Sequence, residues 1–498
     1  MKILSADQIR QWDKYTIQHE PIASIDLMER AATICTNWII EKYGDQKPIK
    51  IFCGKGNNGG DGLAIARQFA AINILSEVYI IDCEKTGTPD FQTNLRKLQH
   101  LPVSIQSLQH IDFLPVISEN EIVIDAMMGT GLKRPLEGLY KATVEHINSS
   151  KATKIAIDVP TGLSSDKIII STIIHATYTL TFQLIKLAFL LPENEVFTGE
   201  VVVLDIGLHK DYLNTVHSIF QLNEIDFVKS LIKPRKKFAH KGNFGHALIV
   251  AGSKGKTGAA ILCTKACLRS GAGLVTTALP ESSFIVLHIT VPEAMAIEQT
   301  NILQADLSTY TTIGIGPGIG THEDSAHIVQ SILANFNKPL VIDADGLNIL
   351  AANNTLLNEL PPGSIITPHI KEFERLFGTA QNHVERLQTA RYYAQKLFVY
   401  IVLKGRYSAL ACPDGEVYFN NSGNAGMATG GSGDVLTGII TGLLTQGYAP
   451  KEACIIGLHI HGLSGDLAAA EMSQEALIAG DIIDYLGKTF LTLSAPIS

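Results

Sequence analysis

Short runs of apolar, mostly β-branched residues alternate along the chain with longer segments whose apolar residues recur at helical spacing. This alternation predicts α/β architecture with largely parallel sheets. In the first half of the chain the predicted strands are residues 49–53, 78–81, 122–126, 155–159, 178–182 and 201–206. In the second half they are residues 247–251, 274–279, 312–315, 340–343, 365–367 and 399–403, followed by a hairpin of residues 408–413 and 416–420.

The strand pattern lapses between His209 and Lys237, which predicts a domain boundary near residue 225. A chain of 498 residues is too long for one hydrophobic core. We therefore expect two domains, residues 1–215 and 229–495, joined by a linker of residues 216–228. Because ligands bind beyond the carboxyl ends of the strands in open α/β sheets, two such domains predict two sites.

Composition and charge narrow the classes of partner. Hydrophobic residues make up 46% of the chain, and the net charge of -8 gives no basic surface for nucleic acid or an anionic membrane. The sequence starts without a secretion-signal pattern, contains no apolar run of membrane-spanning length, and spaces its seven cysteines unlike a disulfide framework. We expect a cytoplasmic homo-oligomer that acts on small molecules.

A glycine-rich loop follows the first predicted strand and opens a helix, since residues 54–62 read GKGNNGGDG. Gly54, Gly56 and Gly59 match the dinucleotide-binding pattern G-x-G-x-x-G, with Asp82 as the ribose ligand, but a lone match of this kind is weak. The loop provides backbone amides at a helix N-terminus, which suit a phosphate. A glycine-rich turn without a ligand is the alternative.

Two further loops end neighbouring strands of the same domain. Asp125 leads into MGTGLKRP at residues 128–135, and Asp158 opens DVPTGL at residues 158–163. An isolated aspartate at a strand end is often only a cap or turn former, but three such loops at one sheet edge favour a binding site. The side chains that together would suit a hard, oxygen-seeking cation are Asn58, Asp125 and Thr161.

These loops resemble those of the NAD(P)HX epimerase family, across residues 1 to about 210. The resemblance implies a Rossmann-like three-layer sandwich that inverts the hydroxyl-bearing carbon of a hydrated nicotinamide ring, with K⁺ (potassium) at Asn58, Asp125 and Thr161. It implies a substrate site made of Asn57, Asn58, Gly59, Gly60, Asp61, Gly129, Thr130, Gly131, Leu132, Lys133, Arg134, Pro135 and Asp158. Inversion needs a positioned acid/base group, for which Asp158 is the first candidate and Lys186 the second.

The second domain carries no P-loop, because Val250 stands where the motif ending in Gly255-Lys256-Thr257 requires glycine. Its strongest motif is NAGMATGGSGDVLTG, at residues 424–438, just before a helix. Backbone amides of residues 431–433 can approach a transferring phosphoryl group there, and Asp434 can take a proton from an attacking hydroxyl. A glycine-rich helix start with Asp434 as a mere first-turn charge is the alternative.

Other loops at predicted strand ends supply polar groups. Lys404 and Arg406 suit nucleotide phosphates, with exposed surface charge as the alternative, and His369 could orient the substrate. Acidic side chains that could approach a nucleotide-bound magnesium ion are Asp343, Glu372 and Glu374. Two close pairs are interpreted as structural, Cys263 with Cys267 and His459 with His461.

The motifs GGSGDVL, TPHIKEF and GPGIG in combination resemble the NAD(P)HX dehydratase branch of the ribokinase-like fold, over about residues 226 to 495. The resemblance implies a ribokinase-like α/β domain that phosphorylates the ring hydroxyl and expels phosphate, with Mg²⁺, ADP as phosphoryl donor and Asp434 as base. It implies nucleotide contacts at Lys404, Gly405, Arg406, Tyr407, Ser408 and Gly433. It implies hydrate contacts at Ala251, Gly318, His369 and Asp434.

The two resemblances together predict a bifunctional repair enzyme for hydrated NADH and NADPH. It would interconvert the R and S epimers and dehydrate the S epimer to NAD(P)H, releasing AMP and phosphate. The alternative is a ribokinase-like kinase of a vitamin or sugar, with a regulatory dinucleotide-binding module at its N-terminus. A kinase would leave the phosphate on its product.

Overall fold

The computed structural model describes residues 1–45, 47–83, 86–132 and 134–494. The chain divides into two compact units, one of Lys2–Ser218 and one of Ile219–Ser498 with Met1. Each unit contains its own sheet and its own hydrophobic core.

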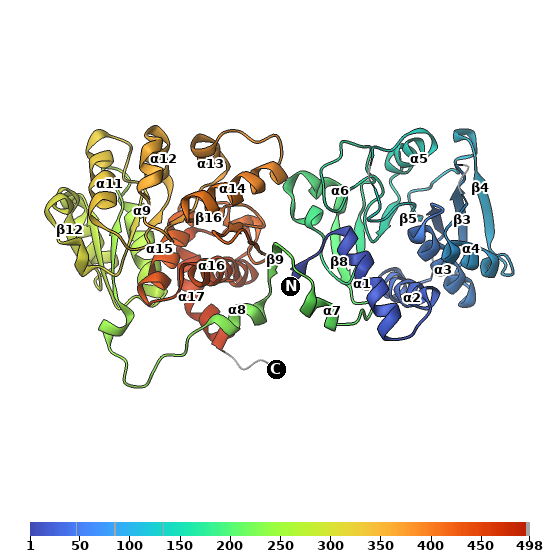
Figure 1. Ribbon diagram of the computed structural model, residues 1–498, viewed down its shortest axis with the longest axis horizontal. Helices are drawn as coiled ribbons and strands as arrows, with labels where there is room; N and C mark the ends of the chain where they lie inside the picture. Colours follow the sequence, from blue (N-terminus) through green and yellow to red (C-terminus); the bar gives the residue numbers. More distant parts are fainter. Residues whose placement is uncertain (46, 84–85, 133, 495–498) are drawn as a thin grey trace. The chain divides into compact units, whose positions relative to one another are not determined.

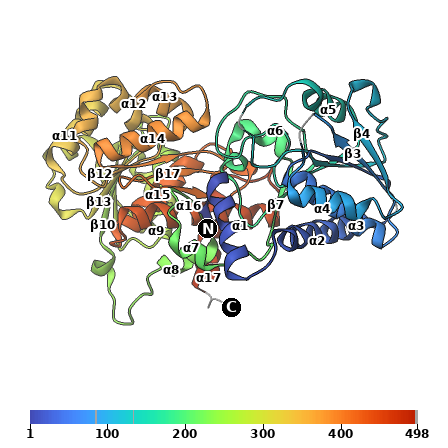
Figure 2. The same cartoon turned by 45° about the vertical axis from the view of Figure 1, so that its right-hand side comes forward.

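The first unit contains a parallel sheet of strand order β4-β3-β2-β5-β6-β7-β8. Its strands are β2 (Ile49–Cys53), β3 (Ser76–Ile81), β4 (Ser104–Leu108), β5 (Ile122–Ala126), β6 (Thr153–Ile157), β7 (Tyr178–Phe182) and β8 (Glu200–Leu204), and the two-residue β1 (Lys2–Ile3) precedes them. Its helices are α1 (Ala6–His19), α2 (Ser24–Tyr43), α3 (Asn57–Ala71), α4 (Pro89–Leu98), α5 (Gly138–Ser149), α6 (Glu195–Thr198) and α7 (Asp211–Thr215). Figures 1 and 2 both place α2, α3 and α4 side by side.

Burial on both faces explains why the central strands are mostly apolar. Ile51 and Cys53 of β2 pack in the same cluster as residues of α2 and α3, whereas Phe52 packs in a second cluster with Val144 of α5. Successive side chains of a strand point to opposite faces, so a sheet covered on both sides favours apolar residues at most positions. The predicted three-layer sandwich is confirmed.

The second unit contains a mixed sheet that includes the strand order β9-β18-β17-β16-β15-β14-β13-β10-β11-β12. The strands are β9 (Phe220–Asn223), β10 (His246–Val250), β11 (Leu274–Leu279), β12 (Met295–Glu298), β13 (Thr312–Ile315), β14 (Val341–Ile342), β15 (Ile365–Ile366), β16 (Tyr400–Leu403), β17 (Ala409–Ala411) and β18 (Val417–Asn420). From β16 to β12 all pairings are parallel, and β17 is antiparallel to both of its neighbours.

Helices lie on both sides of this sheet as well. They are α8 (Ile225–Leu231), α9 (Thr257–Arg269), α10 (Phe284–Thr290), α11 (Glu323–Asn335), α12 (Ala344–Ala352), α13 (Ile370–Phe377), α14 (His383–Leu397), α15 (Ser432–Thr445), α16 (Pro450–Met472) and α17 (Ala479–Ser494). In Figure 1, α11 to α14 lie above β16, whereas α15, α16 and α17 lie below it. The latter three helices share one core cluster with side chains of β14 to β18.

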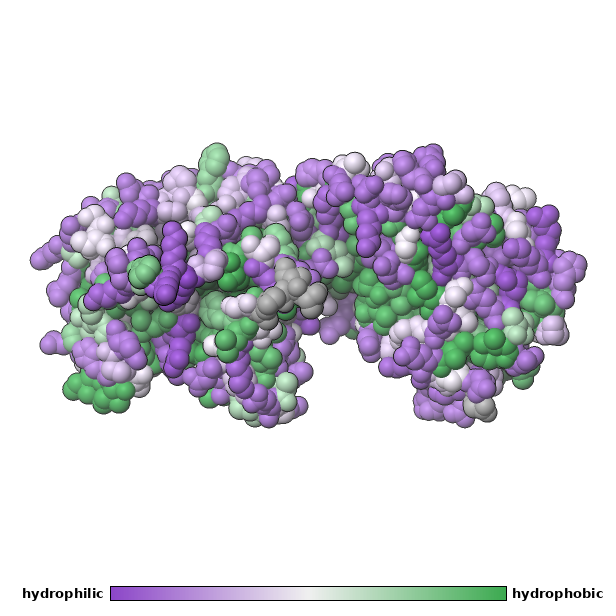
Figure 3. All heavy atoms as spheres, turned by 90° about the horizontal axis from the view of Figure 1, so that it is seen from below, coloured by the Kyte–Doolittle hydropathy of each residue, from purple (hydrophilic) through white to green (hydrophobic). Residues whose placement is uncertain are grey.

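The apolar helix α16 belongs to this core. Among the described helices it alone is long and apolar enough to cross a membrane, but 67% of its most apolar window is buried inside the protein. Its buried side chains pack with those of α15 and α17. Elsewhere, large hydrophobic side chains stay exposed at scattered positions such as Leu75, Ile170 and Phe238, and Figure 3 shows hydrophobic areas interspersed with hydrophilic ones.

The predicted strands are confirmed to within two residues at each end, and the hairpin turns at Asp414 and Gly415 as a β17–β18 pair. The sequence patterns did not reveal β4, β9 and β12. The segment expected to be a linker, residues 216–228, contains β9 and the start of α8, because β9 pairs in parallel with β18.

Two candidate active sites

The N-terminal loop is held close to the sheet edge by its glycines. Gly54 N–H donates to the carbonyl of Ala126, which ends β5, and α3 begins three residues later at Asn57. A Cβ on Gly59 would overlap the Gly54 carbonyl, so the turn cannot take a larger residue without moving. The loop therefore delivers the first turn of α3 to the carboxyl ends of β2 and β5.

A cavity of about 840 Å³ lies at this edge. Ten of the predicted substrate residues line it: Asn57, Asn58, Asp61, Gly129, Thr130, Gly131, Leu132, Arg134, Pro135 and Asp158. Gly59 and Gly60 lie in the same turn of α3 but are not part of the lining, and Lys133 falls outside the described residues. The three glycine-rich loops that the sequence singles out therefore meet at one cavity.

Asp158 is fixed by a buried lysine. Lys186 is fully buried, and its Nζ donates to Asp158 Oδ1 (2.8 Å), Thr181 Oγ1 (2.7 Å) and the Phe182 carbonyl (2.8 Å). Asp158 itself has a left-handed backbone with φ 64° although it is not glycine, a strained conformation that clusters at functional sites. Its second oxygen, Oδ2, lies beside Gly129 in the cavity wall.

Lys186 was the second acid/base candidate of the sequence. Its three acceptors occupy the ammonium, so it is placed to position Asp158 and not to exchange protons with a substrate.

The three residues expected to hold potassium are close to one another. Thr161 donates to Asp125 through both its N–H (2.7 Å) and its Oγ1 (2.6 Å), and Met128 N–H donates to Thr161 Oγ1 (2.9 Å). Burial raises the pKa of the fully buried Asp125 to about 6, and the hydrogen bonds from Thr161 and Met127 oppose that rise. Asn58 and Asp158 both approach Gly129, and Asn58 Nδ2 lacks a hydrogen-bond partner among the described residues. One buried carboxylate with neutral oxygen donors nearby fits a monovalent cation.

The cavity also holds a carboxyl group that the sequence patterns did not single out. Asp13 of α1 lines it together with the predicted Asp61. Burial, then the neighbouring Asp158, raises the pKa of Asp13 to about 6, and Lys186 and Arg10 lower it. Burial, followed by Asp158 and Asp13, raises the pKa of Asp61 well above its usual range. A polar residue inside the apolar stripe Ile9–Ile17 of an amphipathic helix was the available signal for Asp13.

Asp82, the ribose ligand that the dinucleotide pattern suggests, forms contacts beside the cavity and is not among the residues that line it. Lys55 forms an ion pair with Asp82, and Ser107 Oγ donates to its other oxygen (3.0 Å). These contacts lower the pKa of Asp82, the Lys55 hydrogen bond contributing most. Lys55 itself lines the cavity, so this end of the site presents a cation.

In the second unit a left-handed glycine starts α15. Gly431 has φ 91° and precedes Ser432, and a Cβ there would lie 2.5 Å from Leu262 Cδ1. The backbone reversal leaves the amides of the first turn without helical acceptors, at the positive end of the helix. Asp434 lies in this turn.

A buried ion pair lies beside that turn. Asp343, which ends the β14 region, accepts from Lys404 Nζ (2.7 Å) and from Thr437 Oγ1 of α15 (2.8 Å). A Cβ on Gly433 would lie 3.5 Å from Lys404 Nζ. Although burial lowers it, the pKa of Lys404 lies above its ordinary value because Asp343 and Glu372 adjoin the ammonium. The sequence suggested Asp343 and Lys404 separately but not their pairing.

Asp434 is electrostatically prepared to exchange a proton. Burial and the neighbouring Asp343 and Asp345, opposed by Lys404, raise its pKa to about 6. His461 of α16, interpreted as structural, contacts the Ser432 carbonyl through Nε2 (3.0 Å), and burial lowers its pKa to about 4. A neutral imidazole thus supports the start of α15.

The other predicted contacts of this site lie at carboxyl ends of parallel strands. Ala251 follows β10 and is fully buried, and Gly318 follows β13, where Ser253 Oγ donates to its carbonyl (2.7 Å). His369 caps α13 with its side chain, and its backbone N–H donates to Glu372 Oε2 (2.8 Å). Gly405 and Ser408 form a turn, in which the exposed Arg406 lies over the ring of Tyr407 (4.9 Å).

The magnesium candidates divide into two groups. Glu372 lies 3.8 Å from Lys404, whereas Glu374 pairs with Arg386 (3.1 Å). The part of the chain that the structure describes contains no cluster of three or more His, Cys, Asp or Glu side chains that could hold a metal by themselves. Magnesium that arrives with nucleotide phosphates needs only one or two carboxylates, so Asp343 and Glu372 remain compatible with it.

A parallel sheet followed by an antiparallel hairpin, with a glycine-rich helix start and an adjacent aspartate, defines a ribokinase-like domain, here preceded by a Rossmann-like domain. Family models match both parts, as "YjeF-related protein N-terminus" over residues 24–188 and as "NAD(P)H-hydrate dehydratase" over residues 247–488.

Relatives match over nearly the full length. The bifunctional NAD(P)H-hydrate repair enzyme Nnr of Moorella thermoacetica is 35% identical over 98% of this chain and 96% of its own, and that of Escherichia coli is 31% identical over 97% and 92%. The chain belongs to the family of bifunctional NAD(P)H-hydrate repair enzymes.

Two solved structures resemble the second unit. The ADP/ATP-dependent NAD(P)H-hydrate dehydratase of Bacillus subtilis, co-crystallised with ATP and Mg²⁺, is 30% identical with a TM-score of 0.51, covering 55% of this chain and 98% of that one. A ribokinase-like superfamily protein of Enterococcus faecalis is 29% identical with a TM-score of 0.50, covering 56% and 99%. The predicted ribokinase-like fold is confirmed.

Proposed function

We propose that this protein repairs hydrated NADH and NADPH, interconverting the R and S epimers in its first unit and dehydrating the S epimer in its second. The observation that carries the proposal is that each unit brings its family motifs to the carboxyl edge of its own sheet. Two activities require a complete set of motifs at both sheet edges, and this chain has both sets.

For epimerisation, the glycine-rich turn of α3 and the loop of residues 129–135 hold the dinucleotide, and Asp158 takes part in proton transfer. The support is their common cavity and the Lys186 ion pair, which leaves Asp158 Oδ2 available. We assign potassium to Asn58, Asp125 and Thr161, where it would offset the buried charge of Asp125 and supply electrostatic stabilisation to the bound hydrate.

For dehydration, Asp434 is the base that takes the proton of the ring hydroxyl as that oxygen attacks the terminal phosphoryl group of ADP. Elimination of phosphate then restores the dihydronicotinamide ring. The backbone amides at the start of α15 face the charge that develops on the phosphoryl oxygens. Lys404, with the turn Gly405–Ser408 and Gly433, contacts the nucleotide, and Ala251, Gly318 and His369 contact the hydrate; Mg²⁺ accompanies the phosphates.

We place this activity in the cytoplasm of the cell and expect a homo-oligomer. The seven cysteines, all within the described residues, form no disulfide, as expected of a reducing compartment. The size of the assembly is measured by light scattering of the purified chain, and a monomer at micromolar concentration would contradict the expectation.

The test starts from an epimer mixture of hydrated NADH with ADP, Mg²⁺ and K⁺, and follows NADH absorbance and phosphate release. The intact protein should convert all of the hydrate. Asp158→Ala should stop near the initial share of the S epimer, Asp434→Ala should form no NADH, and omission of K⁺ should slow the epimerisation alone. Formation of a stable phosphorylated product, or no NADH with either ADP or ATP, contradicts the repair function.

A further inference from the structure

Helix α1 presents one carboxyl group to the N-terminal cavity. Ile9, Asp13 and Ile17 recur four residues apart and all line the cavity, so Asp13 belongs to an otherwise apolar stripe of the helix. The capping box formed by Ser5 and Gln8 fixes the start of this helix and therefore the direction of the stripe. Among the described residues no hydrogen-bond donor reaches the Asp13 side chain.

Other polar groups of the same cavity are also without partners. Asp61 is 8% exposed and accepts no hydrogen bond from a described side chain or amide, and Asn58 Nδ2 has no acceptor. Because polar groups buried without partners are costly, their presence around one cavity indicates a ligand that carries complementary groups. Asp158 differs, since Lys186 already occupies one of its oxygens.

We propose that Asp13 is a second catalytic residue of the epimerisation. Asp13 protonates the departing hydroxyl, whereas Asp158 accepts a proton from the water molecule that then adds to the ring carbon. This assignment rests on the proposed function and specifies how the inversion proceeds. Asp13 and Asp158 come from different elements, α1 and the end of β6, so two acid/base groups reach one substrate from separate parts of the cavity lining.

The chemistry follows from the substrate. The hydroxyl-bearing ring carbon is bonded to the ring nitrogen, so its C–O bond can break when the Asp13 carboxyl protonates the hydroxyl and water leaves. The nitrogen lone pair then forms a C=N bond. A water molecule adds to the other face of this carbon, its proton passes to the Asp158 carboxylate, and the C=N electron pair returns to nitrogen. One solvent oxygen enters for each inversion, and the reverse inversion returns the proton to Asp13.

The charges around Asp13 suit such an exchange. Its pKa of about 6, set by burial and by Asp158 against Lys186 and Arg10, lets both protonation states occur near neutral pH. The other ionisable groups of the cavity lining are Lys55, Asp61, Cys83, Asp90, Arg134, Glu137 and Tyr140.

The first test follows the oxygen. The full-length protein is incubated with purified R-hydrate of NADH in H₂¹⁸O without nucleotide, so that dehydration cannot consume the product, and the epimers are separated and weighed by mass spectrometry. We expect one ¹⁸O in each inverted molecule above an enzyme-free blank. Inverted product that keeps its original oxygen would overturn the proposal, whereas no inversion at all would contradict the proposed function instead.

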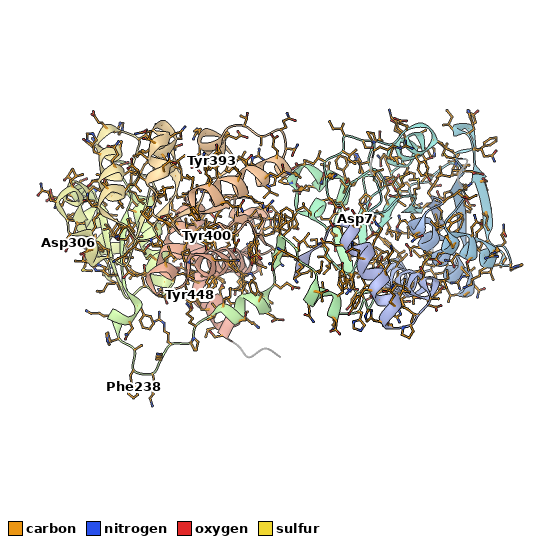
Figure 4. All side chains as sticks on the ribbon, in the orientation of Figure 1. Asp7, Phe238, Asp306, Tyr393, Tyr400 and Tyr448 are labelled. Carbon is orange, nitrogen blue, oxygen red and sulfur yellow. The ribbon has the colours of Figure 1, made fainter. Side chains whose placement is uncertain are left out.

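The second test compares variants of α1. Asp13→Asn should lower kcat of epimerisation about 100-fold or more with KM nearly unchanged, and Asp13→Glu should restore part of it. Asp7→Asn, which alters the exposed aspartate labelled on the same helix in Figure 4, should leave the rate unchanged. Because Asp13 must be protonated, wild-type epimerisation should decline as pH rises through about 6, and Asp13→Asn should lose this decline. An unchanged rate in Asp13→Asn, with S-hydrate dehydration intact as the folding control, would refute the assignment.

Discussion

At the scale of single residues, a carboxyl group serves catalysis only in one of its protonation states, and Asp434 must act in its ionised form. Burial and the neighbouring Asp343 raise its pKa to about 6, so a fall in pH through this value protonates the base. We expect kcat/KM for dehydration of the S-hydrate to be level above pH 7 and to fall tenfold per pH unit well below 6.

Asp345→Asn provides the matched variant for this profile. Asp345 raises the pKa of Asp434 and accepts from Lys256 Nζ (3.2 Å), so its replacement removes a negative charge without touching the base. The fall of kcat/KM at acidic pH should then occur at lower pH, while kcat/KM above pH 7 is largely kept. A fall that stays at the same pH in this variant, or a wild-type rate that is level down to pH 4, would contradict Asp434 as the base.

Some site residues could be predicted from the sequence because local motifs carry them. Asp158 and Asp434 each follow a strand or open a helix within a glycine-rich stretch, and such positions are recognisable without knowledge of distant contacts. Asp13 was not predicted, because only the packing of α1 beside the sheet brings it to the cavity. The Lys404–Asp343 pair, 61 residues apart in sequence, likewise depends on the strand order.

At the scale of elements, the same distinction holds. Central strands were predicted because they are buried on both faces and are mostly apolar, as in β2 and β5, in which all five side chains are buried. β4, β9 and β12 carry polar or exposed side chains, and β4 is exposed at three of its five positions. Their pairing is decided by backbone hydrogen bonds to a neighbouring strand, which a hydrophobic pattern does not record.

The start of α15 gives a prediction at this scale. Gly431→Ala forces a side chain into the left-handed region and against Leu262, so it should destabilise the second unit by about 2–4 kcal/mol and slow dehydration. The matched control is Gly430→Ala, because a Cβ there meets nothing within 4 Å and its φ is not positive. Urea unfolding measures the difference, and equal midpoints for the two variants would show that the turn is not held by Gly431.

At the scale of the whole molecule, the chain combines two compact units, each with its own sheet and its own site. The two activities have opposite requirements for charge, since Asp13 must donate a proton whereas Asp434 must accept one. Both groups have a pKa of about 6, so the ratio of epimerisation to dehydration should decrease as pH rises. The two activities should therefore respond to pH independently of each other.

Complementation between two inactive variants tests whether the sites need to share one chain. Asp158→Ala keeps an intact second unit and Asp434→Ala an intact first unit, so an equimolar mixture contains both activities on separate chains. If the S-hydrate reaches the second site through solution, the mixture should convert the whole epimer mixture to NADH, although Asp158→Ala alone stops near the S share. In the control mixture, the double variant replaces Asp434→Ala, so that Asp158→Ala meets a chain that adds neither activity. Any conversion beyond the S share in this mixture measures spontaneous epimerisation. If NADH formation in the mixture stops at the level reached by Asp158→Ala alone, the hydrate must pass between the two sites of a single chain. The benefit of joining the two units would then be direct transfer of the S-hydrate.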